Sequence, residues 1–371
     1  LNALEVTIEE IIAKADNEKN FGDANAAVAI VIDVDTGELL VCANNKYFDP
    51  SWFVDNDEQS VGKRMETITD EVNTPMFNRA IQAMYTPGSI FKPIVAIAGL
   101  ESNTITAESL IECRMKAEIG EHNFTCLSWH GKINVTKAIE QSCNIFFNQL
   151  GVDTGIDTID AWARAFGFGE KTGIDLPNES SGIISGKEYK MQTFGERWWP
   201  ADTAQTAIGQ LYNNFTPIQI ASYTATLASA GKKYTPHVVL KIVDESGDIV
   251  YEGDKSYTDI GMSKETDATI RHAMEQVAKE GTASRIFSKY PLRVAAKTGT
   301  AETGWEVDSS SNGLSIAYAP ADNPEIAACV VIEKGVWGSY TVPALMRIFN
   351  EYFDIQPEEE IIDDTLVTNE Q

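Results

Sequence analysis

The sequence of 371 residues has little positive charge and no long hydrophobic run. It contains 29 Lys and Arg residues against 55 Asp and Glu residues, which gives a net charge of −26. Because binding to a nucleic-acid backbone needs clustered positive charge, this balance excludes nucleic acid as an electrostatic partner. No stretch approaches the roughly 18 apolar residues of a membrane-spanning helix, and the start does not resemble a signal peptide. The chain starts at Leu1 rather than Met, and we expect an upstream segment in the intact protein.

Cysteine is also scarce, with five residues scattered through the chain: Cys42, Cys113, Cys126, Cys143 and Cys329. This odd and dispersed set excludes a small secreted domain held together by disulfides. Cys42 and Cys329 each fall within a β-like run, and we expect both in the core. What the sequence does contain is 43% hydrophobic and 9% aromatic residues, a composition typical of a folded globular protein.

Hydrophobic periodicity places strands near both ends of the chain and helices between them. We predict strands over 27–34, 38–43, 293–297, 313–319 and 326–333, a small hairpin over 238–251, and helices over 89–100, 135–150, 157–166, 217–230 and 264–279. Residues 44–87 are predicted to be polar and irregular. This order predicts one domain over 1–355, with a single mixed sheet closed by both ends of the chain and an all-helical lobe inserted. Residues 356–371 are acidic and poor in core formers, which predicts a disordered tail.

A serine and a lysine three residues apart on a helix are neighbours, so the amine can serve as a base for the hydroxyl. The sequence holds three such pairs: Ser60 with Lys63, Ser89 with Lys92, and Ser229 with Lys232. Ser60 lies in the polar irregular segment, and Ser229 lies where a helix ends. Only Ser89 follows a Pro-Gly pair at the start of an apolar helix, where free backbone N–H groups favour negative charge on a substrate. We therefore predict Ser89 as a nucleophile, the structural alternative being a simple helix cap.

A Ser-x-Asn motif at Ser142 and Asn144 interrupts a helical run, and a second copy ends at Asn312 in a loop between two strands. Ser-x-Asn alone is weak evidence for a site. The tripeptide Lys-Thr-Gly occurs at 297–299, directly after a β-like run, and again at 171–173 in a loop. A strand edge can align an extended peptide, and glycine lets that backbone approach closely. We therefore predict that the copy at 297–299 lines a site and that the loop copy is structural.

These three motifs, in this order, resemble those of penicillin-binding proteins and serine β-lactamases. The flanking sequences YTPGSIFKP, HGKINVTKAIEQSCNIFFNQLG, FGFGEKTGIDLPNESSG, TAIGQLYNNFTPIQIA and AKTGTAE are similar to class B penicillin-binding proteins, the monofunctional transpeptidases. The similarity extends over about residues 26–352. It implies an α+β fold, with a mostly antiparallel sheet flanked by helices and an all-helical lobe.

The resemblance also implies a reaction. In this family the serine attacks the D-Ala-D-Ala bond of a peptidoglycan stem peptide, and an amine from a neighbouring stem resolves the acyl-enzyme as a crosslink. Carried onto this sequence, Ser89 is the nucleophile and Lys92 its general base. Ser142 passes the proton to the leaving amine, Asn144 holds Lys92 and the substrate amide, and Lys297 supplies positive charge. β-Lactam antibiotics acylate the same serine.

The strand motif supplies the remaining implied contacts. Thr298 and Thr300 are expected to present hydroxyls to the substrate, beside Gly299. The backbone N–H groups of Ser89 and Thr300 are expected to form the oxyanion hole. The chemistry requires no cofactor.

Cys113, Cys126, His130 and Cys143 lie close together in the sequence and are all residue types that bind zinc. His130 and Cys143 fall where some members of the family resemble a zinc-binding version of the fold. Three interpretations stay open at this point: a structural zinc site, a disulfide between Cys113 and Cys126, and free buried thiols.

The resemblance implies further partners and a location. Stem peptides, β-lactams and other cell-wall synthesis proteins are the expected partners, and an N-terminal anchor would hold the protein at the extracytoplasmic face of a bacterial membrane. Two rival functions remain. A β-lactamase would need a base for deacylation, for which Glu179 is the nearest acid by context, although we expect its role to be structural. A β-lactam sensor or scaffold would bind without crosslinking.

Overall fold

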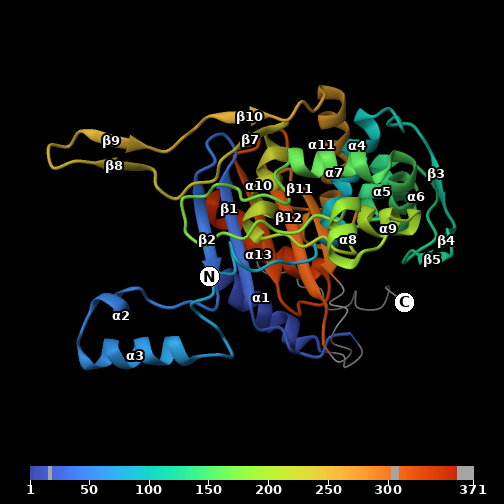
Figure 1. Cartoon of the computed structure of the whole chain (residues 1–371). Coiled ribbons are helices and arrows are strands. Elements are labelled where there is room, and N and C mark those ends of the chain that lie inside the picture. Colours follow the sequence, from blue (N-terminus) through green and yellow to red (C-terminus); the bar gives the residue numbers. More distant parts are fainter. Residues whose placement is uncertain (16–18, 302–308, 357–371) are drawn as a thin grey trace.

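The centre of the molecule is a five-stranded sheet built from both ends of the chain (Figure 1). This computed structural model describes residues 1–15, 19–301 and 309–356. The strand order is β11, β12, β13, β1 and β2, and all neighbours are antiparallel. The strands are β1 (Ala27–Asp33), β2 (Leu39–Asn44), β11 (Ala295–Ala301), β12 (Asn312–Ala319) and β13 (Ile326–Ile332). The predicted strands are therefore confirmed, but the sheet is antiparallel throughout and not mixed, and β11 forms one edge of it.

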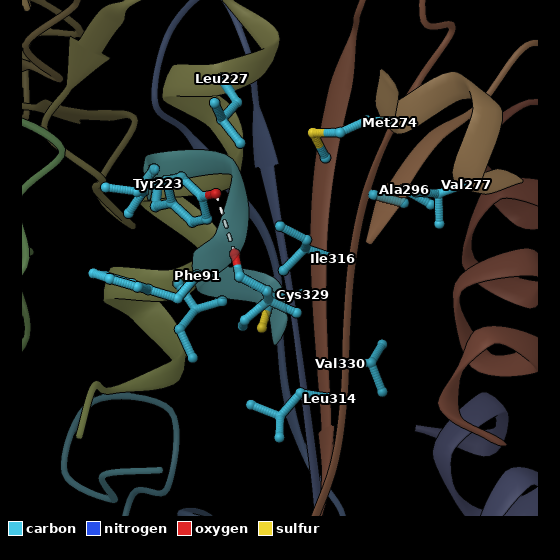
Figure 2. Close-up of a cluster of buried hydrophobic side chains, with 14 of the residues drawn as sticks. Phe91, Tyr223, Leu227, Met274, Val277, Ala296, Leu314, Ile316, Cys329 and Val330 are labelled. Carbon is cyan, nitrogen blue, oxygen red and sulfur yellow. Dashed lines mark hydrogen bonds between the residues drawn. The ribbon is translucent and has the colours of Figure 1, made fainter. Parts of the chain in front are cut away.

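Helices cover both faces of this sheet. One face packs on α10 (Pro217–Ala228) and η1 (Gly88–Phe91); the other packs on α1 (Asn2–Ala13), α11 (Lys264–Lys279) and α13 (Val342–Tyr352), with α12 (Ser284–Phe287) and η2 (Gly338–Thr341) beside them. Because side chains alternate along a strand, neighbouring residues enter different layers. Figure 2 shows Ile316 and Cys329 on the side of Tyr223, whereas Val330 points to the opposite side.

The inserted lobe lies beside β11 and is mainly helical (Figure 1). Its helices are α4 (Lys92–Glu101), α5 (Val135–Glu140), α6 (Asn144–Thr154), α7 (Ile156–Ala165), α8 (Lys187–Phe194) and α9 (Pro200–Ala207). It also carries two short antiparallel pairs: β3 (Ile111–Cys113) with β6 (Gly131–Ile133), and β4 (Lys116–Ile119) with β5 (His122–Thr125). The predicted helix over 135–150 is two helices, because Ser142 adopts a left-handed backbone with φ of 53°.

Two segments project from the body in Figure 1. One is the predicted hairpin, formed by β8 (Lys241–Val243) and β9 (Ile249–Glu252), next to the pair β7 (Lys232–Tyr234) and β10 (Tyr257–Asp259). The other carries α2 (Ser51–Val54) and α3 (Glu58–Thr69). The prediction of an irregular segment over 44–87 was therefore wrong. The side chain of Asp57 accepts a hydrogen bond from Ser60 N and so caps α3, a start signal that the polar composition concealed.

Of the two cysteines expected in the core, one is buried and one is not. Cys329 is buried in β13 as predicted, whereas Cys42 is exposed on β2. Cys42 lies on the edge strand β2, where Leu40 and Val41 are exposed as well. None of the described helices is both long enough and apolar enough to cross a membrane. The predicted tail after residue 356 lies outside the described residues.

Candidate active site

Ser89 lies on η1, a single turn that packs on the core and is positioned by hydrogen bonds. Tyr223 on α10 donates a hydrogen bond of 3.2 Å from its hydroxyl to Ile90 O, which Figure 2 shows as a dashed line. The N–H of Gly88 donates to Gly209 O at 3.1 Å. These two contacts fix the backbone on both sides of Ser89, whose own side chain is half-buried.

Glycines bring η1 into backbone contact with β11 and with the loop after α9. A Cβ on Gly88, whose φ is 53°, would lie 2.3 Å from Thr300 O, and one on Gly299 would lie 2.7 Å from Pro87 O. A Cβ on Gly209 would lie 2.0 Å from Gly88 O. Only residues without a Cβ allow such packing. Gly209 was not identified in the sequence, because nothing local distinguishes a packing glycine from a turn glycine.

Lys92, one turn after Ser89, is fully buried at the start of α4. Its amine donates to Ser142 O at 2.5 Å, to Ser142 Oγ at 3.2 Å and to Asn144 Oδ1 at 2.7 Å. An ammonium has three protons, and these three acceptors use all of them. Burial lowers the pKa of Lys92 to about 8, although the nearby Cys126 and Cys143 oppose the shift. The amine is therefore able to give up a proton near neutral pH.

Lys297, on β11, also contacts the hydroxyl of Ser142. Its amine donates to Ser142 Oγ and to Thr298 O, each at 2.9 Å. Burial, and secondly the charge on Lys92, hold the pKa of Lys297 well below its usual range. Two buried amines that share one hydroxyl cannot both be charged at low cost, so a proton on one disfavours a proton on the other.

The break between α5 and α6 positions the Ser-x-Asn motif. Ser142 occupies the break with its left-handed backbone, and Asn144 is the first residue of α6. Between them, Cys143 caps α6 by accepting a hydrogen bond from Phe146 N. The predicted residues Lys92, Ser142, Asn144 and Lys297 thus form one hydrogen-bonded cluster next to Ser89. A hydroxyl nucleophile, an amine of lowered pKa and a bridging hydroxyl are the groups that acyl transfer needs.

The two threonines of the strand motif have protein partners. The hydroxyls of Thr298 and Thr282 lie 2.6 Å apart, and Thr300 Oγ1 accepts a hydrogen bond of 3.2 Å from Gly338 N. Thr282 belongs to the segment after α11 and gave no local signal in the sequence. The backbone of Thr300, by contrast, lies against Gly88 of η1, with its carbonyl oxygen nearest.

The other copies of the motifs have structural roles. Ser60 Oγ donates to the capping Asp57 at 2.6 Å, and Ser229 Oγ donates to Lys232 O at 2.7 Å. In the loop copy of Lys-Thr-Gly, the N–H and hydroxyl of Thr172 donate to the buried carboxylate of Glu179 at 2.7 and 2.6 Å. The structural role expected for Glu179 is thereby confirmed.

Cys113, Cys126, His130 and Cys143 form a cluster directly behind this site, with all four ligand atoms within 4.8 Å of one another. All three cysteines are free thiols. Asn144 N donates to Cys126 Sγ at 3.3 Å, which links the cluster to the Ser-x-Asn motif. These four residues could hold a metal ion.

Two of the distances within the cluster fit a tetrahedral site. Zinc bonds of about 2.3 Å to sulfur and 2.0 Å to nitrogen place tetrahedral ligands about 3.8 Å apart for two sulfurs and about 3.6 Å for sulfur and nitrogen. The observed separations are 3.9 Å between the sulfurs of Cys126 and Cys143, and 3.6 Å between Cys126 Sγ and His130 Nδ1. The hydrogen bond between the two thiols, followed by backbone N–H donors, lowers the pKa of Cys126. The same hydrogen bond and burial raise the pKa of Cys143.

Curated relatives are similar in sequence over most of this chain. The chain is 32% identical over 338 residues to the peptidoglycan D,D-transpeptidase MrdA of Acinetobacter baumannii, which covers 86% of this chain and 50% of that protein. The MrdA of Escherichia coli is also 32% identical, over 341 residues, with 86% and 53% covered. The chain therefore spans about half the length of these relatives.

Solved structures give the same result for the fold. A complex between penicillin-binding protein PBP2 and MreC from Helicobacter pylori matches with a TM-score of 0.79 and 28% identity, over 95% of this chain and 62% of that one. Pseudomonas aeruginosa PBP2 in complex with WCK 5153 matches with a TM-score of 0.77 and 27% identity, over 95% and 74%. The family model described as the penicillin binding protein transpeptidase domain matches residues 27–354. This chain therefore belongs to the penicillin-binding protein transpeptidase family.

Proposed function

We propose that this chain is a serine peptidoglycan D,D-transpeptidase domain that β-lactams acylate. The observation that carries the proposal is the cluster in which Lys92, Asn144 and Lys297 meet around Ser142, one turn from Ser89. Each group has a place in an acyl transfer, and the loop and helix-end copies of the same motifs have no such neighbours. The relatives named as D,D-transpeptidases support this assignment.

In the first step, Ser89 Oγ attacks the carbonyl carbon of the penultimate D-alanine of a stem. Its proton moves to the neutral amine of Lys92. The backbone N–H groups of Ser89 and Thr300 stabilise the oxyanion, because both lie where η1 contacts the edge of β11. Ser142, hydrogen-bonded to both lysines, passes its proton to the leaving D-alanine and takes one from the Lys92 ammonium, which becomes neutral again.

In the second step, an amine of a neighbouring stem attacks the acyl-enzyme and restores Ser89. Lys297 faces the substrate carboxylate, whose negative charge would raise the pKa of this buried amine again. For Thr298 and Thr300 we propose a substrate contact that competes with their present partners, Thr282 and Gly338. The reaction with a β-lactam follows the first step and stops at the acyl-enzyme.

Turnover of a stem-peptide thioester, in the presence of an acceptor amine, tests this function. We expect release of the thiol together with transfer of the acyl group to the amine. A product that is entirely hydrolysed stem would contradict transfer, as would rapid hydrolysis of penicillin. The latter outcome would favour a β-lactamase. The carboxylate of Glu179, however, binds Thr172, which supports a structural role for it rather than that of a deacylation base.

For the cluster behind the site we propose a closed structural zinc site made by Cys113, Cys126, His130 and Cys143. The ion would stabilise the segment that carries Ser142 and Asn144, because Cys126 and Cys143 contact that segment directly. Cys42, exposed on β2 and distant in the fold, supplies a matched control.

Elemental analysis of protein prepared without chelators tests the site. We expect about one zinc per chain, lost in Cys143→Ser and kept in Cys42→Ser, and removal of zinc should lower both thermal stability and the rate of penicillin acylation. Zinc absent from the wild type, with a mass showing a Cys113–Cys126 disulfide, would contradict the site.

We also propose that the intact protein works at the extracytoplasmic face of the membrane together with other cell-wall synthesis proteins. Peptidoglycan, the proposed substrate, lies on that side. Solved neighbours support the partner class, since one is a complex between PBP2 and MreC and another belongs to a peptidoglycan synthase complex. Fractionation of cells that express the full-length protein would test the location.

A further inference from the structure

A cavity of about 310 Å³ lies at the end of α6 that is farther from the catalytic motifs. Trp198, Trp199 and Pro200, at the start of α9, form one wall. Val152 and Ile156, at the junction of α6 and α7, form another. We call this cavity the Trp198 cleft. Its volume is at the lower limit of small-molecule sites, which measure roughly 300–1,000 Å³.

The two tryptophan rings of the Trp198 cleft are held in place by the protein. Trp198 donates a hydrogen bond of 2.8 Å from its ring N–H to Thr203 Oγ1. The guanidinium of Arg197 stacks over the ring of Trp199 at 3.7 Å. Trp199 is nevertheless 47% exposed. A large aromatic surface that is already ordered and still accessible is suited to bind a ligand, because little entropy is lost on binding.

Polar groups surround this aromatic wall. The hydroxyl of Thr154, a lining residue, is buried and has no hydrogen-bond partner in the part of the chain that the structure describes. An unpaired buried hydroxyl is unfavourable, and rotation about one side-chain bond would offer it to a ligand. Asp157 and Lys187 form an ion pair at the rim. A pyranose ring, with apolar C–H faces and hydroxyls at its edge, is complementary to such a combination.

The length of α6 sets the scale of the distance between the Ser-x-Asn motif and the Trp198 cleft. Asn144 and Thr154 mark the two ends of α6 and are ten residues apart, which corresponds to about 15 Å along a helix. The four stem residues that precede the scissile bond span at most about 14 Å when extended. α9 also links the Trp198 cleft to the catalytic site. It begins at the cleft, and the loop after it holds Gly209, which contacts Gly88 next to Ser89.

We propose that the Trp198 cleft binds a sugar unit of the peptidoglycan strand that carries the donor stem. The inference rests on the proposed function, because the substrate has its sugars one stem length from the scissile bond. The cleft adds a contact with the glycan to the contacts that the catalytic motifs make with the peptide. A polymeric donor is thereby favoured over a free stem peptide.

Titration with stem-free oligosaccharides of alternating N-acetylglucosamine and N-acetylmuramic acid tests the cleft directly. We expect the wild type to bind and Trp199→Ala to bind at least about tenfold more weakly, while Trp199→Phe retains most of the affinity. Trp52→Ala is the control, since Trp52 lies on α2, far from the lobe (Figure 1). No binding by the wild type, or an equal loss in Trp52→Ala, would overturn the proposal. So would a free stem peptide whose binding depends on Trp199 to the same extent.

Kinetics separate this inference from the proposed function. Trp199→Ala should raise KM for a glycan-linked donor about fivefold or more, with kcat on a small thioester and the rate of penicillin acylation unchanged. An unchanged KM would reject the Trp198 cleft and leave the proposed function intact. Failure of the wild type to be acylated would reject the proposed function, while the oligosaccharide titration would still decide whether the cleft binds sugar.

Discussion

The tripeptide Lys-Thr-Gly occurs twice in this chain, in two different environments. At 297–299 it lies in β11, where Lys297 is fully buried and donates to Ser142. At 171–173 it lies in a loop, where Lys171 is exposed and forms no hydrogen bond or ion pair with the described residues. The comparison teaches that the tripeptide has no chemistry of its own. The strand edge, the burial and the neighbouring serine provide it.

Removing each lysine is the strongest way to test this comparison. We expect Lys297→Ala to slow penicillin acylation about 100-fold or more, because a group that acts in proton transfer and charge stabilisation is lost. Lys171→Ala should acylate at nearly the normal rate. Equal losses in two folded variants, checked by stopped-flow acylation and circular dichroism, would show that the wrong copy was chosen.

The pH dependence of acylation sharpens the contrast between buried and exposed lysines. The pKa of Lys92 is lowered to about 8, and its neutral form is the base. The neutral fraction therefore rises about tenfold between pH 6 and 7 and levels off above pH 8 to 9. We expect the acylation rate to follow this rise, and Lys171→Met to leave the profile unchanged. A rate that is flat from pH 6 to 9 would contradict Lys92 as the base.

Substituting the glycines of the two copies should also have different effects, which are smaller than those of removing the lysines. A Cβ on Gly299 would lie 2.7 Å from Pro87 O, so Gly299→Ala should separate β11 from η1, destabilise the fold by about 1–3 kcal/mol and slow acylation about tenfold. Gly173 has a φ of 86°, and its nearest atom would be 3.5 Å away. Gly173→Ala should therefore cost about 1–2 kcal/mol of backbone strain with no effect on acylation. Thermal unfolding and acylation rates of both variants test this. Slower acylation in Gly173→Ala than in Gly299→Ala would contradict the prediction.

No effect on the reaction with penicillin is expected at Glu179, which binds the loop copy. Its carboxylate accepts three hydrogen bonds, two from Thr172 and one from Gly173. Glu179→Ala leaves these donors unpaired, and we expect a loss of about 1–3 kcal/mol in the free energy of unfolding. The deacylation rate of the penicilloyl-enzyme should not change. A slower deacylation would instead identify Glu179 as a hydrolytic base.

The sequence predicted the elements that depend on regular hydrophobic patterns. The strands β1 and β13 are nearly continuous apolar runs, β12 is mostly apolar, and α11 begins and ends at the predicted residues. The sequence did not predict α13 or the break between α5 and α6. The break depends on the left-handed backbone of Ser142, and a pattern of apolar residues gives no information on one dihedral angle.

In the site, too, local sequence patterns predicted some residues and not others. The three motifs predicted Lys92, Ser142, Asn144 and Lys297, which the fold joins by hydrogen bonds. Thr282 and Gly209 could not be predicted, because their roles depend on contacts across the fold with Thr298 and Gly88. The Trp198 cleft is likewise formed by segments distant in the sequence, and no motif marks it.

The central claim is that Ser89 is the acylated nucleophile, and peptide mapping of protein treated with labelled penicillin tests it most directly. We predict that the label is found on the peptide containing Ser89 and that Ser89→Ala takes up none. Label on the peptide containing Ser60 or Ser229, or uptake by Ser89→Ala at the wild-type rate, would contradict the account.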